Sequence, residues 1–155
     1  MKFVADTMLG RLAKWMRIMG CDVVYFHKID DSKLVEFAVK EGRTLLTRDT
    51  LLIKRRKIQG HYFFVEGDNF RDQLRQVAMH FSLPQKQAFL TRCLLCNQEL
   101  KKVDKKNVKD LVPPYVFETQ DSFGICLKCK RIYWQATHKE KMEQEIESTG
   151  IKQPV

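Results

Sequence analysis

The chain has 155 residues, 44% of them hydrophobic, so it can build a folded core, and an intrinsically disordered chain is excluded. Its formal net charge of +9, from 28 basic and 19 acidic residues, favours a polyanionic partner, with nucleic acid expected before membrane. The sequence contains no run of about 18 apolar residues and no signal-peptide pattern, so we expect an intracellular protein, cytoplasmic or nuclear, with no membrane partner.

Short apolar runs alternate with helical patterns over residues 1–84. Branched and aromatic residues predict four strands: Lys2–Ala5, Asp22–Phe26, Thr44–Thr47 and His61–Glu66. Apolar residues at helical spacing, with caps and terminal glycines, predict helices between them: from a cap at Thr7 to Gly20, from Asp31 or Ser32 to Gly42, a short basic helix at Thr50–Lys57, and Asn69–Phe81. Strands that alternate with helices form parallel sheets, so we expect an α/β fold here.

The composition of the chain changes after Pro84. The stretch Gln85–Leu90 is typical of a linker, and a cysteine-containing module follows it. Near the end, Thr137-His138-Lys139-Glu140 has the pattern of a capping box for a charged helix that runs to about Glu147. We therefore expect two units, residues 1–84 and residues 91–147.

Four of the five cysteines form two Cys-x-x-Cys pairs. Two pairs of thiolates suit a closed tetrahedral Zn²⁺ site with a structural role. A redox-active pair is the alternative, but two pairs in one short basic segment favour zinc. The fifth cysteine, Cys21, is expected to be a small core residue. The four predicted zinc ligands are Cys93, Cys96, Cys126 and Cys129.

Three aspartates occur at matching ends of successive strand–helix units. Asp6 follows the first predicted strand, Asp31 opens the helix after the second, and Asp49 follows the third. The carboxyl ends of parallel strands share one edge of a sheet, where open α/β folds place their ligands, so these side chains are expected to meet. Carboxylates suit Mg²⁺ or Mn²⁺, which can activate water for phosphodiester hydrolysis. Each aspartate taken singly is more often a helix N-cap, but three at matching edges favour the metal site.

Three segments resemble a known family: Asp6-Thr7-Met8-Leu9-Gly10-Arg11-Leu12-Ala13-Lys14-Trp15-Met16-Arg17, Asp30-Asp31 and Leu45-Leu46-Thr47-Arg48-Asp49. They are similar to the Mut-seven C-terminal domain, a PIN-like ribonuclease domain, and the resemblance covers nearly the whole chain. It implies a PIN-like α/β/α sheet and metal-dependent RNA cleavage, with Asp6, Asp31 and Asp49 as the acids. Asp68 is the candidate for a fourth acid, and Asp30 is an alternative to Asp31. In animals this domain is fused to 3′–5′ exonucleases, so fusion to or association with such a domain is a further expectation.

Basic residues close to these acids are candidates for holding RNA. Arg11, Arg17 and Arg48 could bind substrate phosphates by charge and hydrogen bonds. The run Lys54-Arg55-Arg56-Lys57 could follow a nucleic-acid backbone, although such runs are as often solvated surface. Three aromatic residues near the second cysteine pair are expected to form the core of that module, with base stacking as the alternative: Phe123, Tyr133 and Trp134.

Together these patterns predict a metal-dependent ribonuclease, a PIN-like α/β domain followed by a zinc ribbon that helps to hold RNA. The main alternative is a nucleic-acid-binding module that does not cleave its ligand. A receiver-like phosphoacceptor domain is a more distant alternative, because that fold needs an acidic pair directly after the first strand, and here Thr7 follows Asp6.

Overall fold

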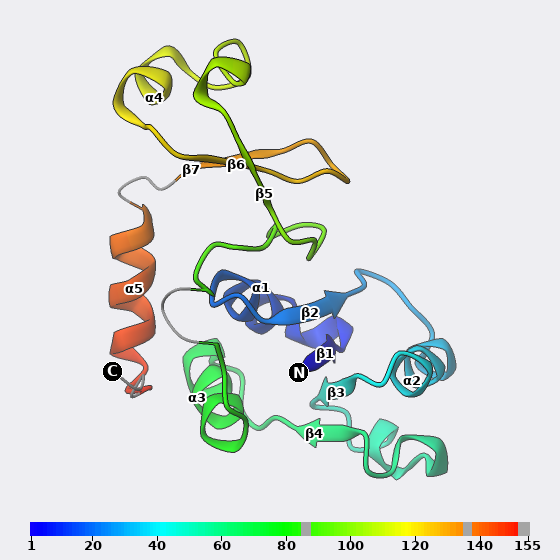
Figure 1. The fold of residues 1–155 in the computed structure, drawn as a ribbon. Helices are drawn as coiled ribbons and strands as arrows, with labels where there is room; N and C mark the ends of the chain where they lie inside the picture. The colour runs from blue at the N-terminus through cyan, green and yellow to red at the C-terminus, as the bar shows by residue number, and fades with distance from the viewer. Residues whose placement is uncertain (85–87, 135–137, 152–155) are drawn as a thin grey trace.

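The first part of the chain folds into a parallel sheet with helices on both faces (Figure 1). The computed structural model describes residues 1–84, 88–134 and 138–151. The strands lie in the order β2-β1-β3-β4 and all run parallel; they are β1 (Lys2–Ala5), β2 (Asp22–Tyr25), β3 (Thr44–Thr47) and β4 (Tyr62–Phe64). The helices are α1 (Gly10–Ile18), α2 (Asp31–Lys40) and α3 (Phe70–His80). The predicted α/β class is confirmed, and β1 and β3 have the predicted bounds.

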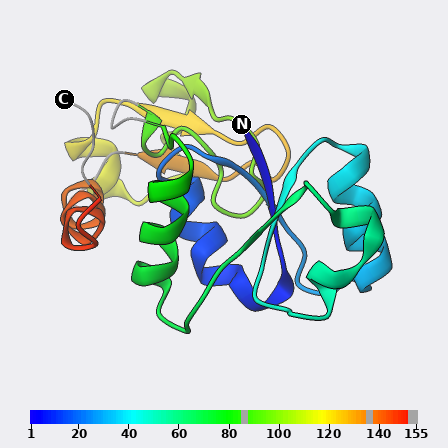
Figure 2. The same cartoon turned by 90° about the horizontal axis from the view of Figure 1, so that it is seen from below.

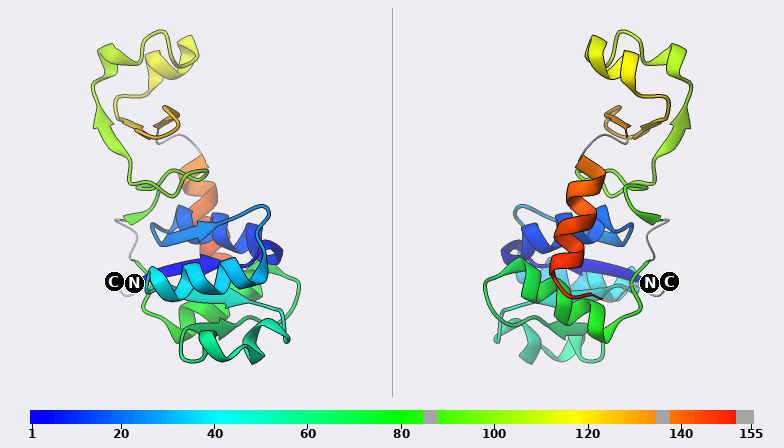
Figure 3. Two further views of the ribbon diagram at one scale, coloured as in Figure 1. Left: turned by 90° about the vertical axis from the view of Figure 1, so that its right-hand side faces the viewer. Right: turned by 90° about the vertical axis from the view of Figure 1, so that its left-hand side faces the viewer.

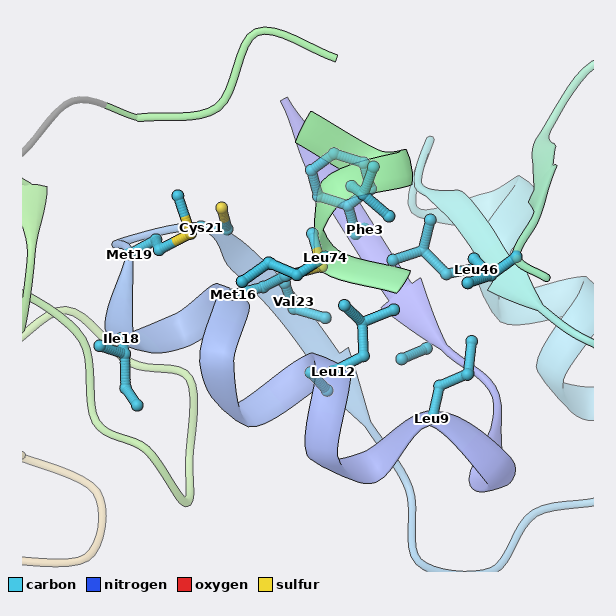
Figure 4. Close-up of a cluster of buried hydrophobic side chains, with 14 of the residues drawn as sticks. Phe3, Leu9, Leu12, Met16, Ile18, Met19, Cys21, Val23, Leu46 and Leu74 are labelled. Carbon is cyan, nitrogen blue, oxygen red and sulfur yellow. The ribbon is translucent and has the colours of Figure 1, made fainter. Parts of the chain in front are cut away.

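Alternate residues of the two central strands serve opposite faces of the sheet. Phe3, Ala5 and Leu46 belong to the buried cluster that contains the apolar residues of α1 and α3. Val4 and Leu45 belong to a second cluster, with the apolar residues of α2. This is the two-residue period of a strand whose faces are both covered. Figure 2 shows the sheet between its two helical layers, and Figure 4 shows side chains of the first cluster.

The end of α1 is closely packed against the segment that precedes the cysteine module. Gly20 has a φ of 86°, a conformation that glycine adopts without steric cost. A Cβ at this position would lie 2.3 Å from the main-chain oxygen of Ala88, so only glycine allows the approach. The main-chain N–H of Leu90 then donates to the oxygen of Ile18 at 2.8 Å. The chain therefore enters the cysteine module already fixed to α1.

The second part of the chain is a small antiparallel sheet with its own core. Its strands are β5 (Lys101–Val103), β6 (Phe123–Ile125) and β7 (Ile132–Trp134), in that order. Phe123 packs with Val108, Val112 and Val116, the last from α4 (Pro114–Thr119), and Trp134 packs against this cluster. Phe123 and Trp134 therefore have the core role expected for them.

The last helix, α5 (His138–Ser148), packs beside α3 (Figure 3). Ile146 is buried in the same cluster as Leu74 of α3, and Arg71 of α3 pairs with Glu145. The main-chain oxygen of Thr149 accepts a 2.5 Å hydrogen bond from Arg75 Nε. The division predicted from the sequence, residues 1–84 and 91–147, groups α5 with the cysteine module. The packing of α5 instead joins it to the parallel-sheet unit.

The predicted basic helix at Thr50–Lys57 is wrong in detail. The segment forms two 3₁₀ turns, Leu52–Lys54 and Arg56–Ile58, because Arg55 between them has an extended conformation with ψ 132°. Two other predictions fall at least partly on positions outside the described residues. They are the linker Gln85–Leu90, of which residues 88–90 are described, and the capping box at Thr137.

Candidate functional site

Asp6 lies at the carboxyl end of β1, and only 6% of the residue is exposed. Its Oδ1 accepts hydrogen bonds from the main-chain N–H of Thr7 at 2.6 Å and from the Thr7 hydroxyl at 3.2 Å, while Oδ2 accepts one from the Thr47 hydroxyl at 2.8 Å. Asp6, rather than Thr7 as predicted, therefore caps the 3₁₀ turn Thr7–Leu9. Among the residues that the structure describes, no basic side chain pairs with this carboxylate. A buried carboxylate held only by neutral donors favours a bound cation.

Thr47 joins Asp6 to Asp49 across neighbouring strands. Its hydroxyl donates to Asp6 and accepts from the main-chain N–H of Asp49 at 3.0 Å. Asp49 Oδ1 accepts hydrogen bonds from the main-chain N–H groups of Leu51 and Leu52, at 2.7 and 3.1 Å. These bonds fix the Asp49 carboxylate and leave its Oδ2 without a donor in the described part of the chain. The structure thus connects two of the predicted acids at one edge of the sheet, which we call the acidic edge.

The second predicted acid, Asp31, is not joined to this pair. It is exposed at the start of α2 and pairs with Arg55 at 3.2 Å. Its neighbour Asp30 has the N-cap position of α2, without a capping hydrogen bond from its side chain, and pairs with Lys33 at 3.5 Å. Over residues 1–84, 88–134 and 138–151, no three acidic side chains bring oxygens within 4.8 Å of one another. The complete three-carboxylate site therefore stays a prediction.

A cavity of about 380 Å³ opens beside the acidic edge. Three arginines line it, Arg11, Arg48 and Arg71, and the guanidinium carbons of Arg11 and Arg71 lie 4.2 and 4.8 Å from the centre of the Phe70 ring. Asp68, the predicted fourth acid, also lines the cavity and pairs with Arg48 at 2.5 Å. We call this the arginine cavity.

Sequence reasoning identified Arg11 and Arg48 but missed Phe70 and Arg71. The available signal was the position of the α3 start, because the helix after the fourth predicted strand begins at the same edge of the sheet as the acids. Of the predicted basic run, Lys54 and Arg56 are exposed on the 3₁₀ turns. Their contact with RNA remains a prediction.

The structure corrects the prediction for Arg17, because only 5% of this residue is exposed. Its Nε donates to the main-chain oxygen of Val23 at 2.8 Å, and its Nη1 donates to those of Leu94 and Leu95 at 2.8 and 3.2 Å. Burial lowers the pKa of the guanidinium, and the charge of Cys93 partly offsets this shift. The cysteine module covers this face of α1, so the donors of Arg17 serve carbonyl groups rather than phosphates.

Asn97 fastens the first cysteine turn to strand β2. Its Oδ1 accepts from the main-chain N–H of Val23 at 2.9 Å, and its Nδ2 donates to Asp22 at 2.7 Å. Arg43 donates to the same Asp22 carboxylate at 2.7 Å. Burial of Asp22 opposes ionisation, but the hydrogen bonds from Arg43 and Asn97 outweigh it, so the pKa of Asp22 is lower than usual. We call Arg17, Asp22, Arg43 and Asn97 the fastening network.

The four predicted zinc ligands gather at one point, with all their Sγ atoms within 4.8 Å of one another. Burial opposes ionisation of Cys93, but hydrogen bonds from the Tyr133 hydroxyl, 3.1 Å away, and from the N–H of Cys96 lower the pKa of Cys93 to about 6. A thiolate at neutral pH is the form that binds metal. The set could hold a metal ion such as zinc. Cys21 lies apart in the core, where burial raises its pKa to about 12.

A comparison with protein-family models shows which family the chain belongs to. The model of the Mut7-C RNAse domain matches residues 1–146. The chain belongs to this family. No curated protein and no solved structure matched the chain.

The Mut7-C RNAse domain spans the acidic edge, the arginine cavity and the cysteine set, so the match confirms the resemblance seen in the sequence motifs. Membership indicates a ribonuclease-type function. No helix in the described part of this Mut7-C RNAse domain is long and apolar enough to cross a membrane.

Proposed function

We propose that this chain is a metal-dependent ribonuclease whose acidic edge binds Mg²⁺ or Mn²⁺ and hydrolyses RNA phosphodiester bonds. The observation that carries the proposal is the Thr47 hydroxyl, which joins the carboxylate of Asp6 to the backbone of Asp49. Asp6 is buried without a basic partner among the described residues, and one oxygen of Asp49 receives no donor from them. This donor set fits a hard divalent cation, which prefers carboxylate oxygens.

The chain's own residues have separate roles in this proposal. Asp6 and Asp49 bind the cation, and Thr47 fixes the orientation of one against the other. A bound Mg²⁺ or Mn²⁺ would supply the Lewis acid that activates water and stabilises the leaving oxygen. Arg48, next to Asp49 in the chain, is placed to hold a substrate phosphate.

Asp31 can complete the proposed ligand set only if its carboxylate leaves Arg55 and binds the cation instead. The pair is half-exposed, with 50% of the Asp31 side chain and 40% of the Arg55 side chain accessible, so its exchange costs little free energy. Asp30 is the alternative ligand from the same turn. We leave Asp68 out of the set, because it lines the arginine cavity and 89% of its side chain is exposed.

The cysteine set has a structural role in the proposal. Four thiolates without an open position suit zinc, which would bind Cys93, Cys96, Cys126 and Cys129. The module that carries them adds basic residues to the surface, and RNA is the proposed partner of the whole chain. Association with a 3′–5′ exonuclease domain is a further proposal.

A nucleic-acid-binding module without cleavage is the second candidate. It is favoured by one observation, that Asp31 and Asp68 are engaged by arginines rather than gathered with Asp6. The deciding experiment incubates the purified chain with single-stranded and structured RNA in Mn²⁺, Mg²⁺ or EDTA. Cleavage that requires the divalent ion supports the nuclease, whereas binding with no cleavage in either ion supports the second candidate.

A further inference from the structure

We propose that the arginine cavity binds a phosphate group of RNA, and that Asp68 occupies the place of this phosphate at Arg48 in the free protein. The proposal rests on the proposed function for its ligand, RNA, but it does not depend on cleavage. It also assigns Asp68 a role different from that of a fourth metal ligand.

The composition of the cavity favours an anion. Three guanidinium groups line it against one carboxylate, that of Asp68, while Glu145, outside the lining, pairs with Arg71. Arg11 is exposed, and no acidic side chain among the described residues pairs with it. Arginine presents several N–H donors in a planar fork that matches the oxygens of a phosphate. At about 380 Å³ the cavity has room for a phosphate with part of the attached nucleotide.

Phe70 holds two of the guanidinium groups in position. The ring is buried, with 4% of the residue exposed, and it stacks on Trp15 at 5.4 Å between ring centres with 16° between the planes. Arg11 and Arg71 lie against this fixed ring, and a guanidinium on an aromatic ring keeps its N–H donors in its own plane. Arg71 uses part of its donors on Glu145, whereas those of Arg11 are available to a ligand. The donors are therefore partly arranged before the ligand arrives, which reduces the entropy lost on binding.

Asp68 marks the position of the ligand at Arg48. Its carboxylate pairs with Arg48 at 2.5 Å although 89% of the Asp68 side chain is exposed, against 25% for Arg48. A carboxylate on an arginine fork uses the same donors that a phosphate would use. Because an ion pair with one partner in solvent contributes little free energy, a phosphate with more than one arginine contact can displace it.

The arginine cavity and the acidic edge are connected through the chain. Arg48 directly precedes Asp49, while Met8 and Leu9, which line the cavity, follow Asp6. A phosphate bound here is held next to the proposed metal ligands. It would thus determine which neighbouring phosphodiester bond reaches Asp6 and Asp49.

The first test measures RNA binding in EDTA, where cleavage cannot interfere, on short oligomers with a 5′-phosphate, a 3′-phosphate or hydroxyl ends only. Arg11→Gln is compared with Lys14→Gln, which removes the same charge one turn along the exposed face of α1, outside the cavity lining. We expect Kd to rise about tenfold for Arg11→Gln, since a hydrogen bond to a charged group is worth roughly 1.4 kcal/mol or more. Equal effects of the two variants would overturn the proposal.

The three oligomers identify the source of the phosphate. A loss on Arg11→Gln that is confined to one phosphorylated oligomer assigns the cavity to that terminal phosphate. An equal loss on all three, with Lys14→Gln unaffected, assigns it to an internal phosphodiester. Both results support the cavity as the phosphate site.

The second test uses Asp68→Asn, with Asp72→Asn as its control. Asp72 is exposed near the start of α3, outside the cavity lining, so its substitution removes the same negative charge without freeing Arg48. We expect Asp68→Asn to tighten RNA binding about fivefold, and Asp72→Asn to change it by less than about twofold. Equal tightening by both variants, or loss of Mn²⁺-dependent cleavage by Asp68→Asn with unchanged binding, would overturn the proposal. Failure of the nuclease proposal would instead appear as absence of cleavage in the wild-type chain.

Discussion

The guanidinium of Arg17 donates a 2.8 Å hydrogen bond to the main-chain oxygen of Leu94, 77 positions further along the chain. The first residue lies on a helix of the parallel-sheet unit, and the second lies between the two cysteines of the first pair. Arg17 also donates to the main-chain oxygen of Val23 in β2, so its buried guanidinium joins α1, the edge of the sheet and the first cysteine turn.

Replacement of Arg17 by Gln should destabilise the whole chain. The variant leaves the main-chain oxygen of Val23 without its donor in a buried setting, and it removes the donor from the partly buried bonds to Leu94 and Leu95. We expect the free energy of unfolding to fall by about 2–5 kcal/mol, measured by urea denaturation with zinc present. Lys14→Gln on the exposed side of α1 is the control and should stay within about 0.5 kcal/mol of the wild type. Equal stability of both variants would contradict the joining role of Arg17.

Zinc should be present at one ion per chain and should depend on all four clustered cysteines. Cys129→Ser is the sharpest variant, because Cys129 is exposed and its substitution perturbs packing little. Elemental analysis should find zinc in the wild type and in Cys21→Ala, whose thiol lies outside the cluster. It should find little zinc in Cys129→Ser. Full zinc content in Cys129→Ser would show that the cluster is not the metal site.

Asp49→Asn should separate cleavage from binding. The amide oxygen of Asn can still accept from the N–H groups of Leu51 and Leu52, so the local turn is kept while a negative charge is lost. We expect RNA cleavage to fall by at least about tenfold, with partial recovery in excess Mn²⁺. RNA binding in EDTA should persist or tighten. An unchanged cleavage rate would remove Asp49 from the active site.

Thr47 provides a matched pair of variants. Thr47→Val keeps the shape of the side chain but removes the hydroxyl that links Asp6 to Asp49, whereas Thr47→Ser keeps the hydroxyl. Cleavage should fall about 10–100-fold in the valine variant, as for other groups that orient metal ligands, and the serine variant should retain most of it. The metal concentration for half-maximal cleavage should rise in the valine variant only. Equal activity of Val and Ser variants would mean that the bridge does not position the acids.

The fastening network should weaken in acid. The pKa of Asp22 is lower in the folded chain than its ordinary value of 3.8, because hydrogen bonds from Arg43 and Asn97 outweigh the effect of burial. A depressed pKa stabilises the fold fully above pH 3.8, and this contribution is lost as the pH falls further, through the folded-state pKa. The difference in unfolding free energy between wild type and Asp22→Asn should therefore shrink below about pH 4. Asp121→Asn, at a 95% exposed side chain, should show no such change. A pH-independent difference for Asp22→Asn would exclude the charge as the cause.

The parts of this structure that local patterns determine were predictable from the sequence. The run Thr44–Thr47 is apolar, short and bounded by turn residues, so its strand bounds are as expected. The cysteine cluster was predictable because two Cys-x-x-Cys pairs have the spacing typical of a tetrahedral zinc site.

The features that sequence reasoning missed depend on distant contacts. Arg17 lies on the buried side of α1, but the first cysteine turn, which contacts it there, comes much later in the chain. Similarly, Asp31 has the position of a metal ligand along the chain, but its partner in space is Arg55 from another turn. The value of Phe70 as a support for Arg11 follows only from the way in which α3 packs against α1. Charge and periodicity alone do not specify such pairs.

Val23 lies at the edge of the parallel sheet, where its main-chain groups could pair with another molecule. It lies in β2, an outer strand of the parallel sheet, and side chains take both of its main-chain groups, the N–H by Asn97 and the oxygen by Arg17. An outer strand with unpaired groups is a template on which a foreign strand can add. Asn97, directly after the first cysteine pair, and Arg17 of α1 therefore cover main-chain groups of β2 on which a strand of another molecule could otherwise add.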